Sequence, residues 1–352
     1  MAAVPVSVIT GFLGSGKTTL LARLLRDPAL ARTAVIVNEF GAVGLDHLLV
    51  EASDEDIVAL DSGCVCCTVR GDLVRTVGDL LARRAAGAVT AFERIVIETT
   101  GLADPAPILH ALMTDPVLAD TVCLESVIAT VDAAAGAATL DAHPESVKQA
   151  ALADRIVVTK TDLADPAANG LADRLHSLNP AAPQLTAVHG ALDAGRLLGG
   201  GLYDPAARGP DVRRWLAAEA LPCHPPSPAG HARSDHGRAD SRHDDAITSF
   251  CLFRKAPLRA VTLSLFLQVL AEHCGAGLLR LKGLVDVRES PGRPAVIHGV
   301  QHVFHPPAWL DAWPDGDRTT RIVVIARGLD SRWMEALLDA LDDEVSALQA
   351  AG

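Results

Sequence analysis

Short apolar runs recur along the first half of the chain and alternate with segments whose apolar residues have helical spacing, such as Leu73, Val77 and Leu80. Uninterrupted runs of this kind are typical of buried parallel strands. Strands that alternate with helices predict an α/β domain, with a mostly parallel sheet and helices on both faces. The expected strands are residues 4–10, 34–37, 94–97, 127–131 and 156–158.

The last third of the chain has a different order of elements. One amphipathic helix follows the first strand of this part, and a second helix follows its last strand. This order predicts a smaller α+β domain with its helices packed on one face of the sheet. Cys251 and Cys274 are expected in its core rather than as metal ligands. The expected elements are strands at 247–254, 278–287, 295–304 and 321–326 and helices at 258–274 and 331–348.

A polar stretch separates the two patterns. Residues 222–245 are rich in proline, serine, glycine, aspartate and arginine and show no hydrophobic period, so we expect a flexible linker at 216–246. The domains are therefore expected at 1–215 and 247–348. The linker contains His231, His236 and His243. Such histidines can bind a transition metal weakly, and a polar linker without a metal role is the alternative.

Composition excludes several functional classes. The chain has 352 residues, enough for two domains with separate cores. A net charge of −12 and an aromatic content of 3% argue against a nucleic-acid partner. No apolar run approaches the roughly 20 residues of a membrane span, and the N-terminus does not read as a signal peptide. We therefore expect a cytoplasmic protein without a membrane or nucleic-acid partner.

The first apolar run leads directly into a glycine-rich motif of the form G-x-x-x-x-G-K-T, which is followed by leucines at helical spacing. In this context backbone N–H groups can surround a phosphate at the helix N-terminus. Lys17 can reach the β- and γ-phosphates, and the Thr18 hydroxyl can bind Mg²⁺. A glycine-rich turn without a ligand is the alternative, but the complete motif favours a nucleoside triphosphate. The expected binding residues are Gly11, Gly14, Ser15, Gly16, Lys17, Thr18 and Thr19.

The fold class follows from the motif and the order of elements together. We expect an α/β fold of the P-loop NTPase type, with the smaller α+β domain after it. In such open sheets ligands bind at the carboxyl ends of the strands. The residues that follow each strand are therefore the next candidates.

Acidic residues and a glycine follow two of these strands. Glu98 ends the run at 94–97 and takes the position that holds Mg²⁺ directly or through water. The backbone N–H of Gly101 is well placed to sense a γ-phosphate. Glu39 follows the run at 34–37 and is a candidate for metal or nucleotide contacts. Asp46, further on, is equally compatible with a solvated loop.

A candidate base-recognition motif follows the run at 156–158. Asp162 can accept two hydrogen bonds from the N1 and N2 edge of guanine, and adenine lacks this pair of donors. Guanine motifs usually begin with asparagine, whose amide Thr159 cannot replace. The motif therefore favours GTP over ATP without making the preference strict.

Three thiols, those of Cys64, Cys66 and Cys67, lie close together before the helix that contains Leu73. A helix N-terminus lowers a thiol pKa and favours the thiolate. Thiolates select Zn²⁺ or Cu⁺ over Mg²⁺. Three ligands in one loop leave a coordination position open, which suits a metal that must later leave. A redox-active thiol pair is the alternative.

Together these segments resemble the CobW family of GTPases, relatives of the GTPases that insert nickel into urease and hydrogenase. The resemblance covers nearly the whole chain, and the cysteine segment makes it specific. It implies a Mg²⁺-dependent GTPase that carries a transition metal, most often zinc, to a client metalloprotein. The matching segments are residues 11–19, 38–41, 63–68, 98–105, 159–163, 279–284 and 299–301.

The resemblance also implies roles for individual residues. Lys17 and Glu98 would be catalytic, and Thr18 with Glu98 would hold Mg²⁺. Some relatives carry acidic residues at the positions of Val37 and Ala42, so the additional metal site that they build is not expected here. The transported metal would bind Cys64, Cys66, Cys67 and Glu39, and the nucleotide would also contact Gly101, Thr159, Lys160 and Asp162.

The sequence therefore predicts a GTPase metallochaperone. Intrinsic turnover should be slow, because no arginine finger is visible. Zinc is the expected metal, but thiolate chemistry leaves Co²⁺ and Ni²⁺ open, including a cobalt chaperone for corrinoid or nitrile hydratase-type clients. A nucleotide-binding metal buffer or sensor and a P-loop kinase for a small molecule are the rival classes. The client and the oligomeric state, a homodimer included, stay open.

Overall fold

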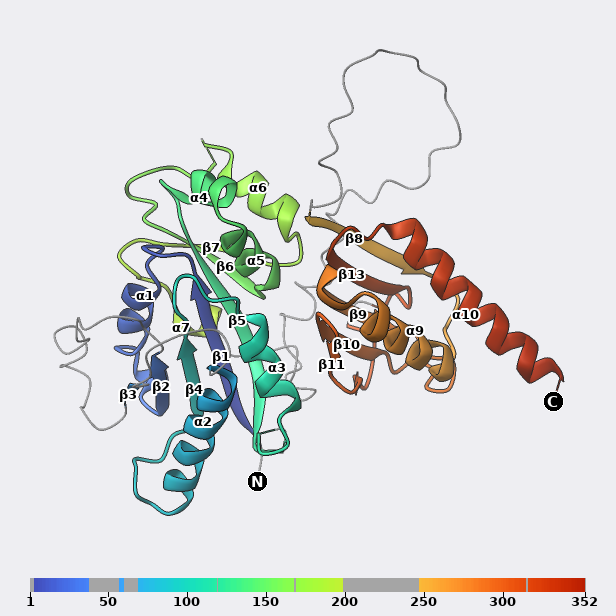
Figure 1. Ribbon diagram of the computed structural model, residues 1–352, viewed down its shortest axis with the longest axis horizontal. Coiled ribbons are helices and arrows are strands. Elements are labelled where there is room, and N and C mark those ends of the chain that lie inside the picture. The colour runs from blue at the N-terminus through green and yellow to red at the C-terminus, as the bar shows by residue number, and fades with distance from the viewer. Residues whose placement is uncertain are drawn as a thin grey trace, which may run out of the picture. The chain divides into compact units, whose positions relative to one another are not determined.

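The computed structural model describes residues 3–37, 57–59, 69–118, 120–167, 169–198, 247–314 and 316–351. The chain divides into two compact units, Met1–Val212 and Arg213–Gly352. Figure 1 shows a sheet with helices in each of them. Among the described residues, no helix has both the length and the apolar character needed to cross a membrane.

The described part of the N-terminal unit contains a seven-stranded sheet in the order β3-β2-β4-β1-β5-β6-β7. Every neighbouring pair in it is parallel. Parallel neighbours need crossover connections, and α4 and α5 lie in the one between the neighbours β5 and β6. This confirms the predicted α/β class. The strands are β1 (Val4–Gly11), β2 (Thr33–Val37), β3 (Ile57–Ala59), β4 (Arg94–Glu98), β5 (Val122–Asp132), β6 (Arg155–Thr159) and β7 (Gln184–Ala187).

Helices cover both faces of this sheet. Consecutive strand residues point to opposite faces. Ile128 packs with helices α1 and α7, whereas the next residue, Ala129, packs with α4, α5 and α6. Figure 1 shows the helices on the two sides of the strands. The helices are α1 (Lys17–Leu24), α2 (Val69–Ala85), α3 (Ala106–Thr114), α4 (Gly136–Ala142), α5 (Pro144–Leu152), α6 (Leu171–Leu178) and α7 (Ala194–Leu197), with a 3-10 turn η1 (Pro28–Leu30).

Strand β5 is longer than its apolar run predicts. It begins at Val122, and its first half carries a buried carboxylate, Glu125. Ser7 Oγ donates a hydrogen bond of 2.8 Å to this carboxylate, and Arg94 donates two, of 3.1 and 3.2 Å. The polar residue is tolerated because it is paired. The sequence pattern also predicts neither β3 nor β7, the short edge strands.

The described part of the C-terminal unit contains an antiparallel sheet in the order β11-β10-β9-β13-β8, with β12 paired to β10. Two long helices pack on one face, where Phe266 and Met334 meet Leu281 and Ile322 in the core. The predicted α+β arrangement is confirmed. The elements are β8 (Ile247–Arg254), α9 (Ala260–His273), η5 (Gly275–Gly277), β9 (Leu278–Val285), β10 (Ala295–Val300), β11 (Val303–Phe304), β12 (Ala308–Trp309), β13 (Thr320–Arg327) and α10 (Ser331–Ala351).

One strand prediction in this unit is wrong. Residues 295–304 form a hairpin and not a single strand. Val300 pairs with Val303 across a tight turn, and Gln301 in that turn has a φ of 53°. The apolar residues on both sides of the turn hide this reversal in the sequence. Cys251 and Cys274 are both buried, and burial raises the pKa of the Cys274 thiol.

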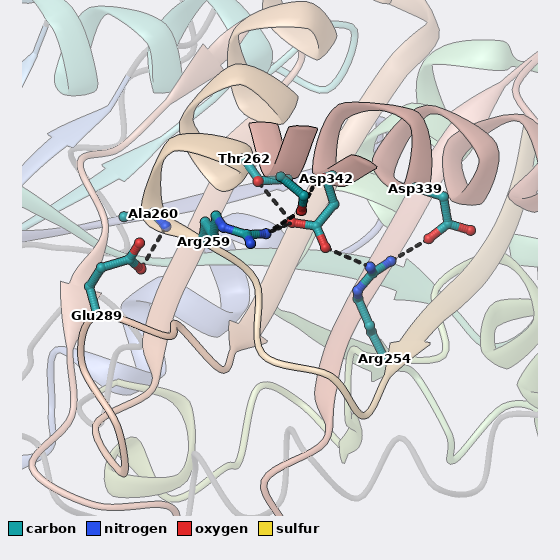
Figure 2. A network of polar contacts seen from close by, with 8 residues as sticks. Arg254, Arg259, Ala260, Thr262, Glu289, Asp339 and Asp342 are labelled. Atoms are coloured by element: carbon teal, nitrogen blue, oxygen red, sulfur yellow. Dashed lines mark hydrogen bonds and ion pairs between the residues drawn. The ribbon is translucent and has the colours of Figure 1, made fainter. Parts of the chain in front are cut away.

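A network of charged side chains fixes α10 to the rest of the C-terminal unit (Figure 2). Asp342 accepts hydrogen bonds from Arg254 on β8 at 2.9 Å, from Thr262 at 3.0 Å and from Arg259 at 3.4 Å. Arg254 also contacts Asp339, one turn earlier on the same helix. The side chain of Asp342 is only 13% exposed, whereas that of Asp339 is 64% exposed. Asp342 is therefore the buried centre of this attachment.

Candidate functional site

The glycine-rich loop runs from the end of β1 to the start of α1. Gly14 and Gly16 have φ angles of 72° and 89°, a region that glycine enters without steric cost. A Cβ atom on Gly11 would lie 2.3 Å from Thr130 Oγ1. The backbone conformation therefore requires glycine at these positions. The loop ends at the N-terminus of α1. Such a terminus presents free N–H groups to an anion.

Lys17 folds back over this loop. Its Nζ donates hydrogen bonds to the carbonyl oxygens of Gly11 at 2.9 Å and Phe12 at 3.2 Å. The residue is only 8% exposed. The ammonium is thus held inside the loop, where a bound phosphate would meet its positive charge. This is the placement that the motif predicts for Lys17.

The two residues expected to hold Mg²⁺ lie in contact. Thr18 Oγ1 donates a hydrogen bond of 2.7 Å to Glu98 Oε1. The register of β1 against β4 pairs Ile9 with Glu98, so this carboxylate lies next to the end of β1, where the loop begins. Glu98 is 3% exposed. A hydroxyl and a carboxylate side by side are hard oxygen ligands, so the donor set fits Mg²⁺.

The segment after Glu98 packs directly on the loop. Thr99 N donates to Ile9 O at 2.9 Å, and its hydroxyl donates to Thr10 Oγ1 at 3.0 Å. A Cβ atom on Gly101 would lie 2.6 Å from the backbone nitrogen of Leu13. Only glycine permits this approach. Gly101 therefore lies beside the loop, where its expected γ-phosphate contact requires it to be.

Thr159 ends β6 beneath the loop. Its hydroxyl donates hydrogen bonds to Ser15 O at 2.7 Å and to Val131 O at 3.3 Å, and the residue is 4% exposed. The side chain therefore ties the base-recognition motif to the phosphate loop. This use of the hydroxyl explains how threonine can occupy the first position of the motif.

The rest of the motif projects from a sharp turn. Lys160 has a φ of 55°, and its Nζ contacts Asp132 Oδ2 at 2.7 Å. Burial alone would raise the pKa of Asp132, but the hydrogen bond from Lys160 and two from backbone N–H groups lower it. The Asp162 side chain is 33% exposed, and the nearest ring nitrogen of His189 lies 4.0 Å from it. Asp162 is therefore accessible to a base.

Asp132 and His189 are absent from the residues selected by sequence reasoning. Asp132 ends an apolar strand, as Glu98 does, and this position is the signal that could have found it. His189 follows β7, an edge strand that the sequence pattern does not reveal. Neither residue belongs to a recognisable motif, so only the fold brings them to Lys160 and Asp162.

The expected transition-metal ligands lie outside the described residues. These are Glu39, Cys64, Cys66 and Cys67, and the same holds for Asp46, Ala42 and the linker histidines. The structure describes the elements that flank them. Val37 at the end of β2 pairs with Glu98, and α2 begins at Val69. Within the described ranges, no group of three or more His, Cys, Asp or Glu side chains is arranged to hold a metal.

Comparison with known proteins agrees with this geometry. Residues 5–186 match the model of the "CobW/HypB/UreG, nucleotide-binding domain", and residues 247–342 match that of the "Cobalamin synthesis protein cobW C-terminal domain". The zinc chaperone YjiA of Escherichia coli is 32% identical over 96% of this chain and 98% of its own. The zinc chaperone CobW of Sinorhizobium sp is 32% identical over 96% and 97%.

A solved structure supports the same relationship. The crystal structure of Zn(II)-bound YjiA GTPase from E. coli matches with a TM-score of 0.67 and 28% sequence identity. The match covers 97% of this chain and 99% of that one. The resemblance inferred from the motifs is therefore confirmed, and the chain belongs to the CobW/HypB/UreG family.

Proposed function

We propose that this protein is a Mg²⁺-dependent GTPase that binds a transition metal, zinc in the first place, and delivers it to a client metalloprotein. The observation that carries the proposal is the 2.7 Å contact between Thr18 and Glu98 beside the buried Lys17. The relatives named zinc chaperones and the structure named a GTPase support the choice of zinc and GTP.

The phosphate end of the site would act by charge and position. N–H groups at the start of α1 and the Lys17 ammonium bind the β- and γ-phosphates. When bound at Thr18 and Glu98, Mg²⁺ offsets the negative charge that develops on the phosphate oxygens. Gly101, packed on Leu13, offers its N–H to the γ-phosphate. Slow turnover stays a prediction, made because the sequence shows no arginine finger in an obvious place.

The base end of the site would select guanine. Asp162 accepts hydrogen bonds from N1 and N2 of the base, and its exposed position supports this role. Lys160 borders the base from the turn at the end of β6. Thr159 contributes indirectly, through its hydrogen bond to the phosphate loop.

The metal would be cargo rather than a resident cofactor. Cys64, Cys66 and Cys67, with Glu39, form the proposed ligand set. The pairing of Val37 with Glu98, two residues before Glu39, supports a position of Glu39 close to the nucleotide. Cobalt or nickel would suit the same thiolates. The client, the cytoplasmic location and the domain limits of 1–215, 216–246 and 247–348 stay predictions.

The test is steady-state GTP hydrolysis with Mg²⁺ by wild type and Glu98→Gln. We expect hydrolysis to fall roughly 100-fold, because a neutral amide is a much weaker Mg²⁺ ligand and charge stabilisation is lost. Glu125→Gln is the matched control, since it replaces another buried carboxylate of the same sheet. Wild-type rates in Glu98→Gln would contradict the proposed site, as would a loss of equal size in the control.

A further inference from the structure

A glutamine on α5 holds the segment that follows Glu98. Gln149 Nε2 donates hydrogen bonds to the carbonyl oxygens of Gly101 at 3.1 Å and Ala103 at 3.0 Å. Gln149 is 1% exposed. Both acceptors are carbonyl groups, so only the amide nitrogen of the side chain can face them. The contact is therefore a directed one, made away from solvent.

The segment that Gln149 holds is also the one that packs on the phosphate loop. Ala103 N donates to Thr100 O at 3.1 Å and closes a turn around Gly101. The other side of Gly101 lies against Leu13. Gln149 thus fixes the turn from one side while the phosphate loop confines it from the other. The position of the Gly101 N–H depends on both contacts.

The residue before Gln149 holds the far end of the same segment. Lys148 forms an ion pair with Asp104, and Asp104 Oδ1 accepts a hydrogen bond of 3.0 Å from Ala106 N at the start of α3. The Lys148 side chain is 24% exposed. Partly exposed ion pairs contribute little on their own. The buried contacts of Gln149 are therefore the stronger of the two ties.

Helix α5, which carries Lys148 and Gln149, is itself held at its C-terminal end by Asn179. Asn179 Nδ2 donates to the carbonyl oxygens of Ala150, Ala151 and Ala153, at 2.9, 3.1 and 2.9 Å. A cavity of about 40 Å³ lies behind the phosphate loop and is lined by Gln149 together with Phe12 and Ser15. Side-chain packing around Gln149 is thus incomplete on that side. The hydrogen bonds to Gly101 and Ala103 are therefore the direct connection between Gln149 and the segment after Glu98.

We propose that Gln149 is a positioning residue for the γ-phosphate, which makes the site bind a nucleoside triphosphate more tightly than a diphosphate. The inference rests on the proposed function, because it requires GTP at the phosphate loop. In the proposed function the loop and Lys17 contact the β- and γ-phosphates, and Gln149 hydrogen-bonds to neither the loop nor Lys17; only the γ-phosphate also contacts the Gly101 segment. The γ-phosphate depends on the Gly101 segment, whose carbonyl groups Gln149 fixes.

The experiment measures the dissociation constants of GDP and a non-hydrolysable GTP analogue, with Mg²⁺, for wild type and Gln149→Met. Methionine keeps the length of the side chain and removes both donors. We expect affinity for the analogue to fall about tenfold, the effect of losing one or two buried hydrogen bonds, while GDP affinity changes less than about twofold. The kcat for GTP should fall as well, because the γ-phosphate is the reacting group.

Gln184→Met is the matched control, since Gln184 Nε2 donates to Ala172 O at 2.8 Å in the same unit. It should leave the preference for the triphosphate unchanged. Equal losses for both nucleotides in Gln149→Met, or no loss, would overturn the inference. If that variant does not fold, Gln149→Leu decides, because it also removes both donors to Gly101 and Ala103; the same selective loss for the analogue is expected, and no selective loss there would overturn the inference. Failure of wild type to bind either nucleotide would refute the proposed function instead.

Discussion

Thr159 illustrates how a departure from a motif is accommodated at the scale of one residue. Its hydroxyl is used by Ser15 and Val131 and so links the end of β6 to the phosphate loop. The side chain is therefore turned toward the protein interior. In the proposed function, recognition of the base would then depend on Asp162, whose side chain is 33% exposed.

Asp162→Asn should change the preferred base from guanine to xanthine. Asparagine offers an N–H donor, which matches the O2 atom of xanthine and not the N2 amino group of guanine. We expect GTP affinity to fall at least about tenfold and XTP affinity to rise, because polar mismatches in a binding site are costly. Competition binding with both nucleotides measures this. Asp165→Asn, an exposed loop substitution nearby, should change neither affinity.

If Asp162→Asn bound GTP as wild type does, Asp162 would have no role in base recognition. The preference for GTP over ATP would then need another explanation, in which His189 or backbone groups of its turn read the base.

A second prediction at this scale concerns His305 in the C-terminal unit. Burial and the charge of Arg280 lower its pKa from 6.5 to about 4. Above pH 6.5 the ring is neutral in both folded and unfolded chains and has no effect. As pH falls from 6.5 to 4, the unfolded chain gains a proton that the folded one resists. Stability is therefore lost across this window, by at most roughly 3 kcal/mol.

Denaturant unfolding of wild type and His305→Gln between pH 7 and 4 measures the effect. The loss of stability on acidification should be smaller in His305→Gln, whereas His302→Gln, at an exposed position, should follow wild type. Parallel pH profiles for wild type and His305→Gln would contradict the lowered pKa.

The site residues that sequence reasoning could identify are those with fixed spacing along the chain. Lys17 and Thr18 are set by the loop motif, and Glu98 by its place at the end of an apolar strand. Gln149 lies in the middle of a helix, and its partners are backbone carbonyl groups far away in sequence. No pattern of side chains marks such a contact. It is visible only after folding.

At the scale of elements, burial decides what the sequence reveals. Central strands such as β4 and β6 are covered by helices on both faces and appear as apolar runs. The edge strands β3 and β7 are short and lack this pattern. The hairpin of β10 and β11 is missed because its turn contains no glycine or proline.

The attachment of α10 gives a prediction at this scale. Asp342→Ala removes the carboxylate that pairs with Arg254 and Arg259, and both guanidinium groups would stay partly buried. We expect the free energy of unfolding of the C-terminal unit to fall by roughly 2–4 kcal/mol, because Arg254 and Arg259 lose their largely buried counter-charge. Asp339→Ala removes the exposed partner of the same arginine and should cost less than about 1 kcal/mol.

Chemical denaturation of the full chain, followed by tryptophan fluorescence, measures both variants. Trp333 at the start of α10 lies on the helix whose attachment is altered. Equal losses in the two variants would contradict the expectation that the less exposed carboxylate, Asp342, matters more than the exposed Asp339.

At the scale of the whole molecule, the parallel sheet places the carboxyl ends of β2, β4 and β1 next to one another. Glu98 ends β4, which lies between β2 and β1. The chain after β2 continues to the proposed metal ligand Glu39, and the chain after β1 forms the phosphate loop. In the proposed function, binding of the γ-phosphate would influence both neighbouring strand ends. If nucleotide alters metal affinity, metal must alter nucleotide affinity by the same factor.

The proposed chaperone function requires that metal binding and nucleotide affinity are coupled. The measurement is GTP affinity and hydrolysis with and without one equivalent of Zn²⁺, for wild type and the double variant Cys66→Ser/Cys67→Ser. We predict a zinc-dependent change in wild type that disappears in the variant, because the thiolates are the proposed metal ligands. Identical nucleotide behaviour in all four samples would contradict a coupled chaperone and indicate a metal buffer that carries a nucleotide.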